Sequence, residues 1–183
     1  MNWGTFDIDN ELRIRKKLES MLKYDIELQK NDDKYSFDFC VFRYNTKTNN
    51  KYLLGFIEVE TSDTWIDEWP SFWKYHSFLA RKVFKFDYLN KRFTKTLKDE
   101  WMRTIYLIVN HNLTDMFCQS LKVISTFKLQ YSNVKNNEYN DYYLRINKNN
   151  KKIIHGDLNC KEFIKEFFES QKILDEYDDK NLK

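Results

Sequence analysis

The chain has 183 residues, of which 42% are apolar and 32% are charged, and its formal net charge is +3. This length and apolar share predict one folded domain over residues 1–183 with a substantial core, followed from about residue 175 by an acidic tail that frays. A run of about 18 uncharged apolar residues is absent, and so is a secretory apolar core, which excludes a membrane-spanning helix and secretion. We therefore expect a cytoplasmic or intracellular protein.

The three cysteines, Cys40, Cys118 and Cys160, are far apart and include no CxxC pair. This pattern predicts neither a disulfide framework nor a zinc site, so we expect reduced core thiols. Asn, Lys, Tyr and Ile are abundant, whereas the chain has only 3 glycines and 1 proline. Such usage suggests an AT-rich genome and hints at a virus or phage as the source.

The first predicted element is a helix from Asp9 or Asn10 to about Leu28. Two strands follow, in YSFDFCV and LLGFIEVE, because apolar and polar residues alternate in both segments. The polar stretch RYNTKTNNK between them suits a hairpin loop. A turn centred near Thr48 sets Asp38 directly across from Glu58.

The later elements are a helix over residues 70–86 with Pro70 in its first turn, and a buried central strand over 103–110. A third helix over 113–125 with Asn112 as its cap, a hairpin turning at 147–150, and a last helix over 161–174 complete the chain. This order predicts an α/β fold in which helices flank a mixed central β-sheet.

Alternation places Asp38, Glu58 and Glu60 on one face of the predicted hairpin, with Phe56 on the same side. Three carboxylates within one or two strand spacings repel each other, so a cation is expected among them. Hard oxygen ligands suit Mg²⁺ or Mn²⁺, which activate water and offset charge in phosphodiester hydrolysis. The same alternation also fits the solvated face of a half-exposed strand.

These residues and the order of elements resemble the PD-(D/E)xK nuclease superfamily over Glu11 to about Ser125. In that family a helix precedes an antiparallel pair bearing Asp and then (D/E)x(K/E), followed by a helix, a buried strand and another helix. The resemblance implies a restriction endonuclease-like three-layer sandwich. It also implies that Asp38 and Glu58 bind the metal, with Glu60 at the position usually held by lysine.

Glutamate at that position departs from the usual family pattern, and some restriction endonucleases of the superfamily have glutamate there and are active. The resemblance implies that Glu60 acts as general base or second metal ligand, or that a lysine migrates from the next helix. Lys74 is the migrated candidate, and an exposed helix lysine is the alternative. Glu11 on the first helix would assist the metal site, as an acidic residue there does in many members.

A basic segment begins at Arg81 and reads RKVFKFDYLNKRFTKTLK, in which aromatic residues are interleaved. Such a segment either follows a phosphate backbone or forms a solvated helix face. The first alternative makes DNA the partner and assigns its binding to Arg81, Lys82, Lys85, Lys91 and Arg92.

Trp65, Trp69 and Trp73 recur at intervals of four residues. They form either an aromatic platform for bases or part of the core.

The leading hypothesis is a metal-dependent DNA endonuclease or nickase that uses Mg²⁺ or Mn²⁺. A second hypothesis is a nuclease-fold protein that has lost catalysis and binds nucleic acid or another protein. A third is a structural or assembly component of a virus or phage. A homodimer and a protein partner both stay open.

Overall fold

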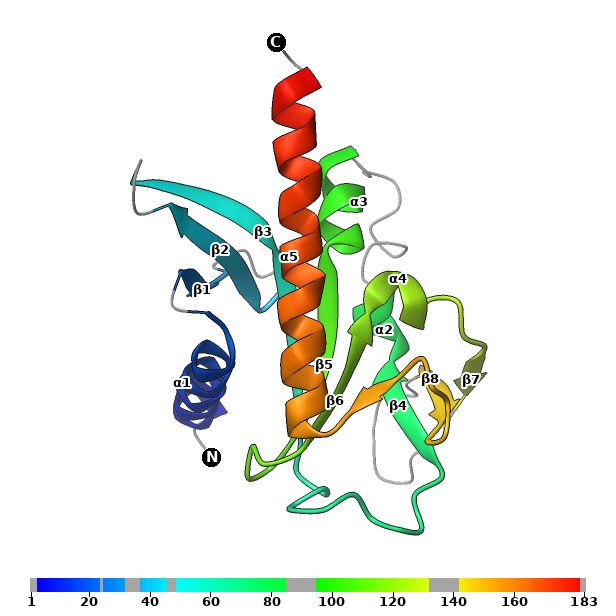
Figure 1. The fold of residues 1–183 in the computed structure, drawn as a ribbon. Helices are drawn as coiled ribbons and strands as arrows, with labels where there is room; N and C mark the ends of the chain where they lie inside the picture. Colours follow the sequence, from blue (N-terminus) through cyan, green and yellow to red (C-terminus); the bar gives the residue numbers. More distant parts are fainter. Residues whose placement is uncertain are drawn as a thin grey trace.

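The structure is a computed structural model that describes residues 3–23, 25–31, 37–45, 49–84, 95–131 and 142–181 (Figure 1). Its helices and strands are, in chain order, α1 Trp3–Met21, β1 Ile26–Lys30, β2 Phe39–Asn45, β3 Asn50–Ser62, β4 Tyr75–Leu79, α2 Ala80–Val83, α3 Lys95–Met102, β5 Thr104–Asn110, β6 Met116–Ser120, α4 Leu121–Ile124, β7 Leu129–Tyr131, β8 Tyr142–Asn147, β9 Ile154–His155 and α5 Asp157–Asn181.

The central sheet is mixed, as the sequence predicts. Its six strands have the order β1-β2-β3-β5-β6-β9, in which β3 and β5 are parallel and the other neighbours are antiparallel. Strand β5 is buried along its whole length, in agreement with the expected central strand, because layers cover both faces of the sheet at this point. A smaller antiparallel sheet has the order β4-β8-β7.

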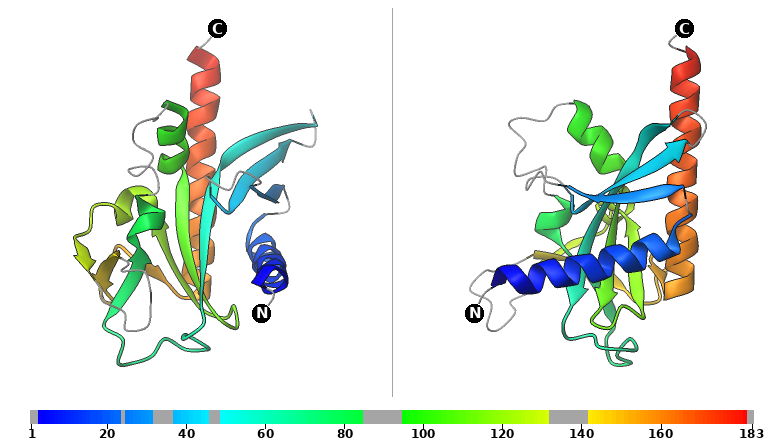
Figure 2. Two further views of the ribbon diagram at one scale, coloured as in Figure 1. Left: turned by 180° about the vertical axis from the view of Figure 1, so that it is seen from behind. Right: turned by 90° about the vertical axis from the view of Figure 1, so that its left-hand side faces the viewer.

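Helices α1 and α5 cover one face of the central sheet, and the smaller sheet with α2 and α4 covers the other (Figures 1 and 2). The first core, between the helices and the sheet, contains Ile14, Leu18, Ile57, Val59, Leu107, Ile164 and Phe168. The second core, on the opposite face, contains Phe37, Phe56, Trp65, Phe78, Val83, Tyr106, Ile108 and Phe117. The predicted α/β class is confirmed, and the second face carries a sheet as well as helices.

The β2–β3 hairpin keeps the expected register at its inner end, where Phe39 pairs with Ile57 and Asp38 is next in line opposite Glu58. A β-bulge lies farther out, because Val41 pairs with Gly55 and Phe42 with Leu53. The extra residue is Leu54, which is buried in the first core. Its neighbour Leu53 is exposed.

The predicted bounds of the first helix are wrong. It begins before Asp9 and ends at Met21, and Ile26–Lys30 forms strand β1 rather than the end of the helix. β1 is an edge strand paired with β2, and its Leu28 is buried in the first core. Pairing with a strand outweighs the local helical pattern here, as tertiary contacts often do.

The helix expected over residues 70–86 is also wrong, because only Ala80–Val83 is helical. Residues 75–79 form strand β4, in which buried His76 and Phe78 alternate with more exposed Tyr75 and Ser77. Phe72, near the start of this segment, is 77% exposed. The apolar residues of this segment fit both helical and strand periodicity. Pairing with β8 stabilises the strand.

The helix expected over residues 113–125 is replaced by strand β6 and the short helix α4. Asn110 organises the tight turn between β5 and β6, because its Oδ1 accepts hydrogen bonds from Thr114 N at 2.8 Å and Asp115 N at 3.1 Å. Its Nδ2 donates to Asp67 O at 2.6 Å. Asn112 therefore lies in a turn and does not cap a helix.

The late hairpin is wrong in its pairing. β8 joins β4 and β7 in the smaller sheet, whereas β9 joins β6 in the central sheet. The last helix is confirmed as α5 and is longer than expected at both ends. Within the described residues, none of the helices is both long enough and apolar enough to cross a membrane.

Gly55 allows the backbones of β3 and the start of β5 to approach closely. A Cβ at this position would lie 2.4 Å from Arg103 O and 2.8 Å from Phe168 Cε1. We expect Gly55→Ala to lower the free energy of unfolding by about 2–3 kcal/mol in urea denaturation. In Gly156→Ala, the new Cβ would meet only Asn159 Nδ2 at 3.6 Å, and the strain of φ +95° would cost about 1 kcal/mol. A smaller loss for Gly55→Ala than for Gly156→Ala would contradict this account.

His76 is a fully buried histidine whose ring nitrogens have no hydrogen-bond partner among the described residues. Its ring centroid lies 4.4 Å from those of Trp69 and Phe117. Burial lowers the pKa of His76 to about 4, helped by the charge of His155 and opposed by that of Asp115. The folded state therefore holds a neutral imidazole.

This shift predicts that stability falls on acidification, because the unfolded chain binds a proton at His76 more readily than the folded chain does. The contribution is constant above about pH 6.5 and is lost progressively down to about pH 4, for a total of about 3 kcal/mol. Urea denaturation across this range should give a flatter profile for His76→Leu than for the unmodified protein. If the free energy of unfolding depended on pH equally in both proteins, the lowered pKa of His76 would be refuted.

Candidate functional site

Glu58 is a carboxylate buried against the second core, since its neighbours Ile57 and Val59 belong to the first core. Its side chain is only 3% exposed and accepts an ion pair from Lys82, whose Nζ lies 2.9 Å from Glu58 Oε1. The same Nζ donates a hydrogen bond to Val59 O at 2.9 Å. A carboxylate and a main-chain carbonyl of β3 thus converge on one cation.

Asp38 joins the same end of the hairpin. Its Oδ2 accepts a hydrogen bond from Val59 N at 2.7 Å. The side chain therefore extends the β2–β3 pairing by one position beyond Phe39, the first residue of β2. Asp38 itself is exposed. The main chain of Val59 therefore contacts a carboxylate through its N–H and an ammonium through its carbonyl oxygen.

Glu60 is held by Tyr106, whose hydroxyl donates a hydrogen bond to Glu60 Oε2. Tyr106 lies opposite Glu58 in the parallel β3–β5 pairing and is fully buried. Burial raises the pKa of Tyr106 well above its ordinary value, and the charge of Glu60 and the hydrogen bond to it act in the same direction. The phenol therefore remains a hydrogen-bond donor that orients the Glu60 carboxylate.

Lys82 remains an ammonium in this setting. Burial lowers its pKa, but the charges of Glu58 and Asp38, the hydrogen bond to Glu58 and the charge of Glu60 together raise the pKa above its ordinary value. A lysine with a raised pKa does not take a proton from water at neutral pH. Its chemistry here is that of a fixed positive charge.

We call Asp38, Glu58, Glu60, Lys82 and Tyr106 the carboxylate–lysine site. Within the residues that the structure describes, no three Asp, Glu, His or Cys side chains converge closely enough to hold a metal ion by themselves. Magnesium, however, usually takes one or two carboxylates and fills its remaining positions with water and substrate oxygens. Glu58 Oε1 and Val59 O already converge on a cation, so the donor set fits a hard divalent ion.

Of the other predicted site residues, Glu11 lies apart from this group and Lys74 lies near Glu60 alone. The side-chain contact of Glu11 is an ion pair with Lys30, and α1 packs on the first core, on the opposite face from Glu58. Lys74 is exposed just before β4, where its carbonyl accepts a hydrogen bond from Lys148 N at 2.9 Å. It lines a cavity together with Glu60.

The residues predicted to bind nucleic acid have different environments in the structure. Arg81 is exposed on α2, whereas Lys82, its neighbour, faces Glu58 with 24% of its side chain exposed. Lys85, Lys91 and Arg92 lie outside the described residues.

Sequence analysis missed Tyr106 and did not assign Lys82 to the carboxylates. A signal for Lys82 was present, because it lies three residues after buried Leu79 and next to buried Val83, on the inner side of the short helix. Tyr106 had no local signal. Its position opposite Glu58 follows only from the pairing of β3 with β5, which the sequence does not specify.

A comparison with protein-family models finds no match for this chain, and a comparison with curated proteins likewise finds none. Among solved structures, it is similar to one described as the structure of D212, a nuclease from a fusselovirus. The TM-score is 0.46 and the sequence identity is 14%, with 91% of this chain and 92% of that chain covered.

Removing the Lys82 charge should expose the cost of burying Glu58. We expect Lys82→Met to lower the free energy of unfolding at pH 7 by about 3 kcal/mol, because an uncompensated carboxylate is left in the sheet. The double variant Glu58→Gln/Lys82→Met should recover part of this loss in urea denaturation.

The matched control is Lys17→Met. Its partner Asp157 lies at 3.1 Å and is 41% exposed, so the loss should stay within about 1 kcal/mol. Equal losses of unfolding free energy in Lys82→Met and Lys17→Met would contradict the expectation that burial of Glu58 makes its ion pair more important for stability.

Proposed function

We propose that the carboxylate–lysine site is the active site of a metal-dependent phosphodiesterase that cleaves DNA. The observation that carries this proposal is the convergence of Lys82 Nζ on Glu58 Oε1 and Val59 O, at 2.9 Å each, next to the Asp38 carboxylate. Two carboxylates and a carbonyl oxygen at one end of the hairpin are hard ligands that suit Mg²⁺ or Mn²⁺, and the lysine from α2 can offset charge on a phosphate.

Asp38, Glu58 and the Val59 carbonyl oxygen are the groups that would hold Mg²⁺ or Mn²⁺, once the Lys82 ammonium moves off Glu58 Oε1 and Val59 O towards the phosphate. When bound, the ion would activate water and offset negative charge on the phosphate oxygens. Lys82 would add a fixed positive charge beside the phosphate and balance the carboxylates before substrate arrives. Lys82, in place of Lys74, would be the lysine of the site, but as a fixed charge and not as the group that activates water.

Glu60 is the proposed general base, because Tyr106 fixes the orientation of its carboxylate. Water would attack phosphorus and pass its proton to Glu60, while the bond from phosphorus to one ester oxygen breaks. The products are a phosphomonoester and a hydroxyl, which takes its proton from solvent.

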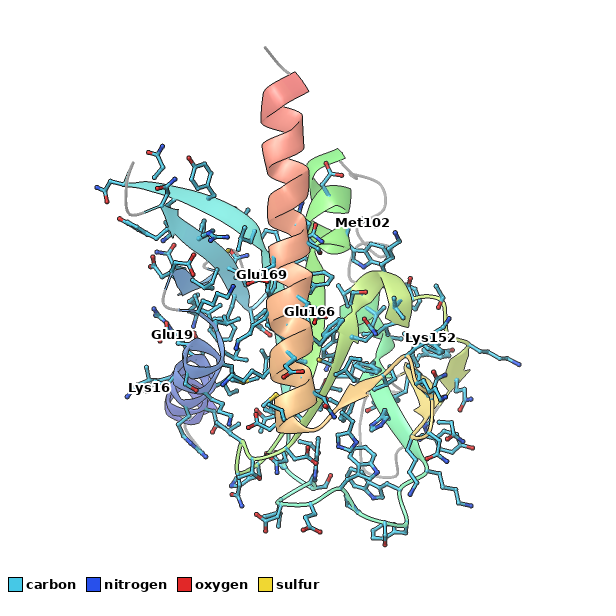
Figure 3. The ribbon with its side chains drawn as sticks, viewed as in Figure 1. Lys16, Glu19, Met102, Lys152, Glu166 and Glu169 are labelled. Carbon is cyan, nitrogen blue, oxygen red and sulfur yellow. The ribbon has the colours of Figure 1, made fainter. Side chains whose placement is uncertain are left out.

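Conversion of supercoiled plasmid to nicked or linear DNA in Mg²⁺ or Mn²⁺ tests this proposal. We expect cleavage that EDTA abolishes, and a fall in rate of at least about 100-fold in Asp38→Asn and in Glu58→Gln. Lys82→Arg keeps the charge and should retain more activity than Lys82→Met. The matched control is Glu19→Gln, because Glu19 lies on α1, which covers the opposite face of the central sheet from Glu58, and pairs there with Arg15 (Figure 3).

A second candidate is a nucleic-acid-binding protein of the same fold without catalysis. The observation that favours it is that the Lys82 ammonium lies 2.9 Å from Glu58 Oε1 and already compensates the charge of this carboxylate. Binding of DNA without cleavage, together with no binding of Mg²⁺ or Mn²⁺ in calorimetry, would establish this candidate and overturn the first.

A further inference from the structure

A cavity of about 520 Å³ opens beside the carboxylate–lysine site and is lined mainly by aromatic residues. Glu60 forms part of its wall, so the cavity and the site share a side chain. The opposite walls come from the segment 62–77 and from β8. This volume is in the range of small-ligand sites, which is about 300–1,000 Å³.

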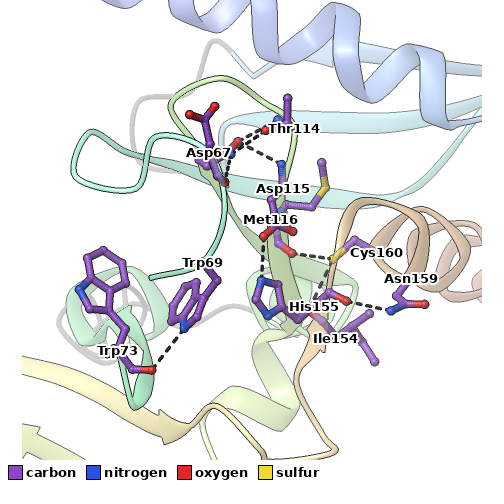
Figure 4. Close-up of polar contacts among 11 residues, drawn as sticks. Asp67, Trp69, Trp73, Thr114, Asp115, Met116, Ile154, His155, Asn159 and Cys160 are labelled. Atoms are coloured by element: carbon purple, nitrogen blue, oxygen red, sulfur yellow. Dashed lines mark hydrogen bonds and ion pairs between the residues drawn. The ribbon is translucent and has the colours of Figure 1, made fainter. Parts of the chain in front are cut away.

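The aromatic rings of the cavity are held in place by contacts that need no ligand. Trp69 Nε1 donates a hydrogen bond to Trp73 O at 3.3 Å, and the two ring centroids are 5.1 Å apart in an edge-to-face arrangement (Figure 4). Trp65, on the inner side, packs edge-to-face on Trp69 at 5.0 Å. The outer ring, Phe72, is 77% exposed although it lines the cavity. The rings of Trp65, Trp69 and Trp73 are thus preorganised, and the Phe72 side chain is left open to solvent.

Cationic and hydroxyl groups accompany the rings. Lys74 and Arg145 line the same cavity, as do Ser62, Thr64 and Ser77. A purely apolar ligand would use none of these groups. A nucleotide matches the combination, because its base stacks on aromatic rings, its polar edges bond to hydroxyls, and its phosphate pairs with cations.

The distance from the carboxylates also fits a nucleotide chain. Glu58 and Glu60 are two residues apart on one face of β3, which is about 7 Å along the strand. A phosphodiester at Asp38 and Glu58 would therefore have its neighbouring nucleotide at the mouth of the cavity. A base can enter only if it is unpaired and unstacked, because a base inside a duplex cannot reach such a pocket.

We propose that this aromatic cavity binds an unstacked base next to the scissile phosphate, so that the protein selects single-stranded or locally unpaired DNA. This inference rests on the proposed function for its cleavage site. The base subsite itself needs no metal, and its binding is measurable without catalysis.

The test is fluorescence anisotropy in EDTA, with the full chain and two labelled strands. One is a short oligothymidylate, and the other is an abasic strand of the same length and charge. We expect the unmodified protein to bind the base-bearing strand at least about fivefold more tightly. Phe72→Ala/Trp73→Ala should reduce that ratio toward one, whereas Phe72→Tyr/Trp73→Phe, which keeps both rings, should preserve it. The Trp69 hydrogen bond goes to the Trp73 main chain and survives these changes.

Two controls separate stacking from charge and from general damage. Tyr52→Ala removes another exposed ring, on the β2–β3 arm, and should leave the ratio unchanged. Lys74→Gln should weaken binding of both strands alike and reduce the slope of log affinity against log salt by about one. Equal affinity of the unmodified protein for the two strands, or an unchanged ratio in Phe72→Ala/Trp73→Ala, would overturn the inference.

The two proposals fail separately. Preference for the base-bearing strand, without metal-dependent cleavage of either plasmid or a single-stranded oligonucleotide, would overturn the proposed function and support the subsite. Metal-dependent cleavage without that preference would overturn the subsite and leave the proposed function standing.

Discussion

The burial of the Glu58 charge is the constraint on which the arrangement of this molecule depends. A carboxylate at 3% exposure costs several kcal/mol unless a cation compensates it, and the compensating group is Lys82 on α2. Helix α2 follows β4 directly, and β4 is fixed by its pairing with β8. The smaller sheet therefore determines where the ammonium lies. The layer over the second core is part of the site's electrostatics as well as its packing.

The parts of the fold that the sequence predicts are those with one unambiguous local period. The β2–β3 hairpin alternates around a polar loop, β5 is a continuous apolar run, and α5 repeats its apolar residues at helical spacing. The segment 70–86 fits both a helical stripe and an alternating strand, and only the edge of β8 decides between them. The separation of β8 from β9 depends on partners far away in the chain, which no local pattern specifies.

The candidate site divides in the same way. Asp38, Glu58 and Glu60 were found by alternation and register, because all three lie on or beside one hairpin. Lys82 and Tyr106 reach them from α2 and from a parallel strand, so their roles depend on tertiary packing. The PD-(D/E)xK resemblance rests on the hairpin motif and stays a prediction. The lysine beside the carboxylates is Lys82, which comes from the segment 70–86 as expected but is a different residue from Lys74.

The β-bulge at Leu54 divides β3 into two stretches with different tolerance of change. The extra residue reverses the alternation between the outer arm and the inner stretch that carries Glu58. Outside the bulge, insertion or loss of residue pairs would alter only the length of the projecting arm (Figure 1). Between Leu54 and Glu58, a single inserted residue would turn the carboxylates into the first core. The outer part of the β2–β3 hairpin can therefore change in length while Glu58 and Glu60 keep their face of the sheet.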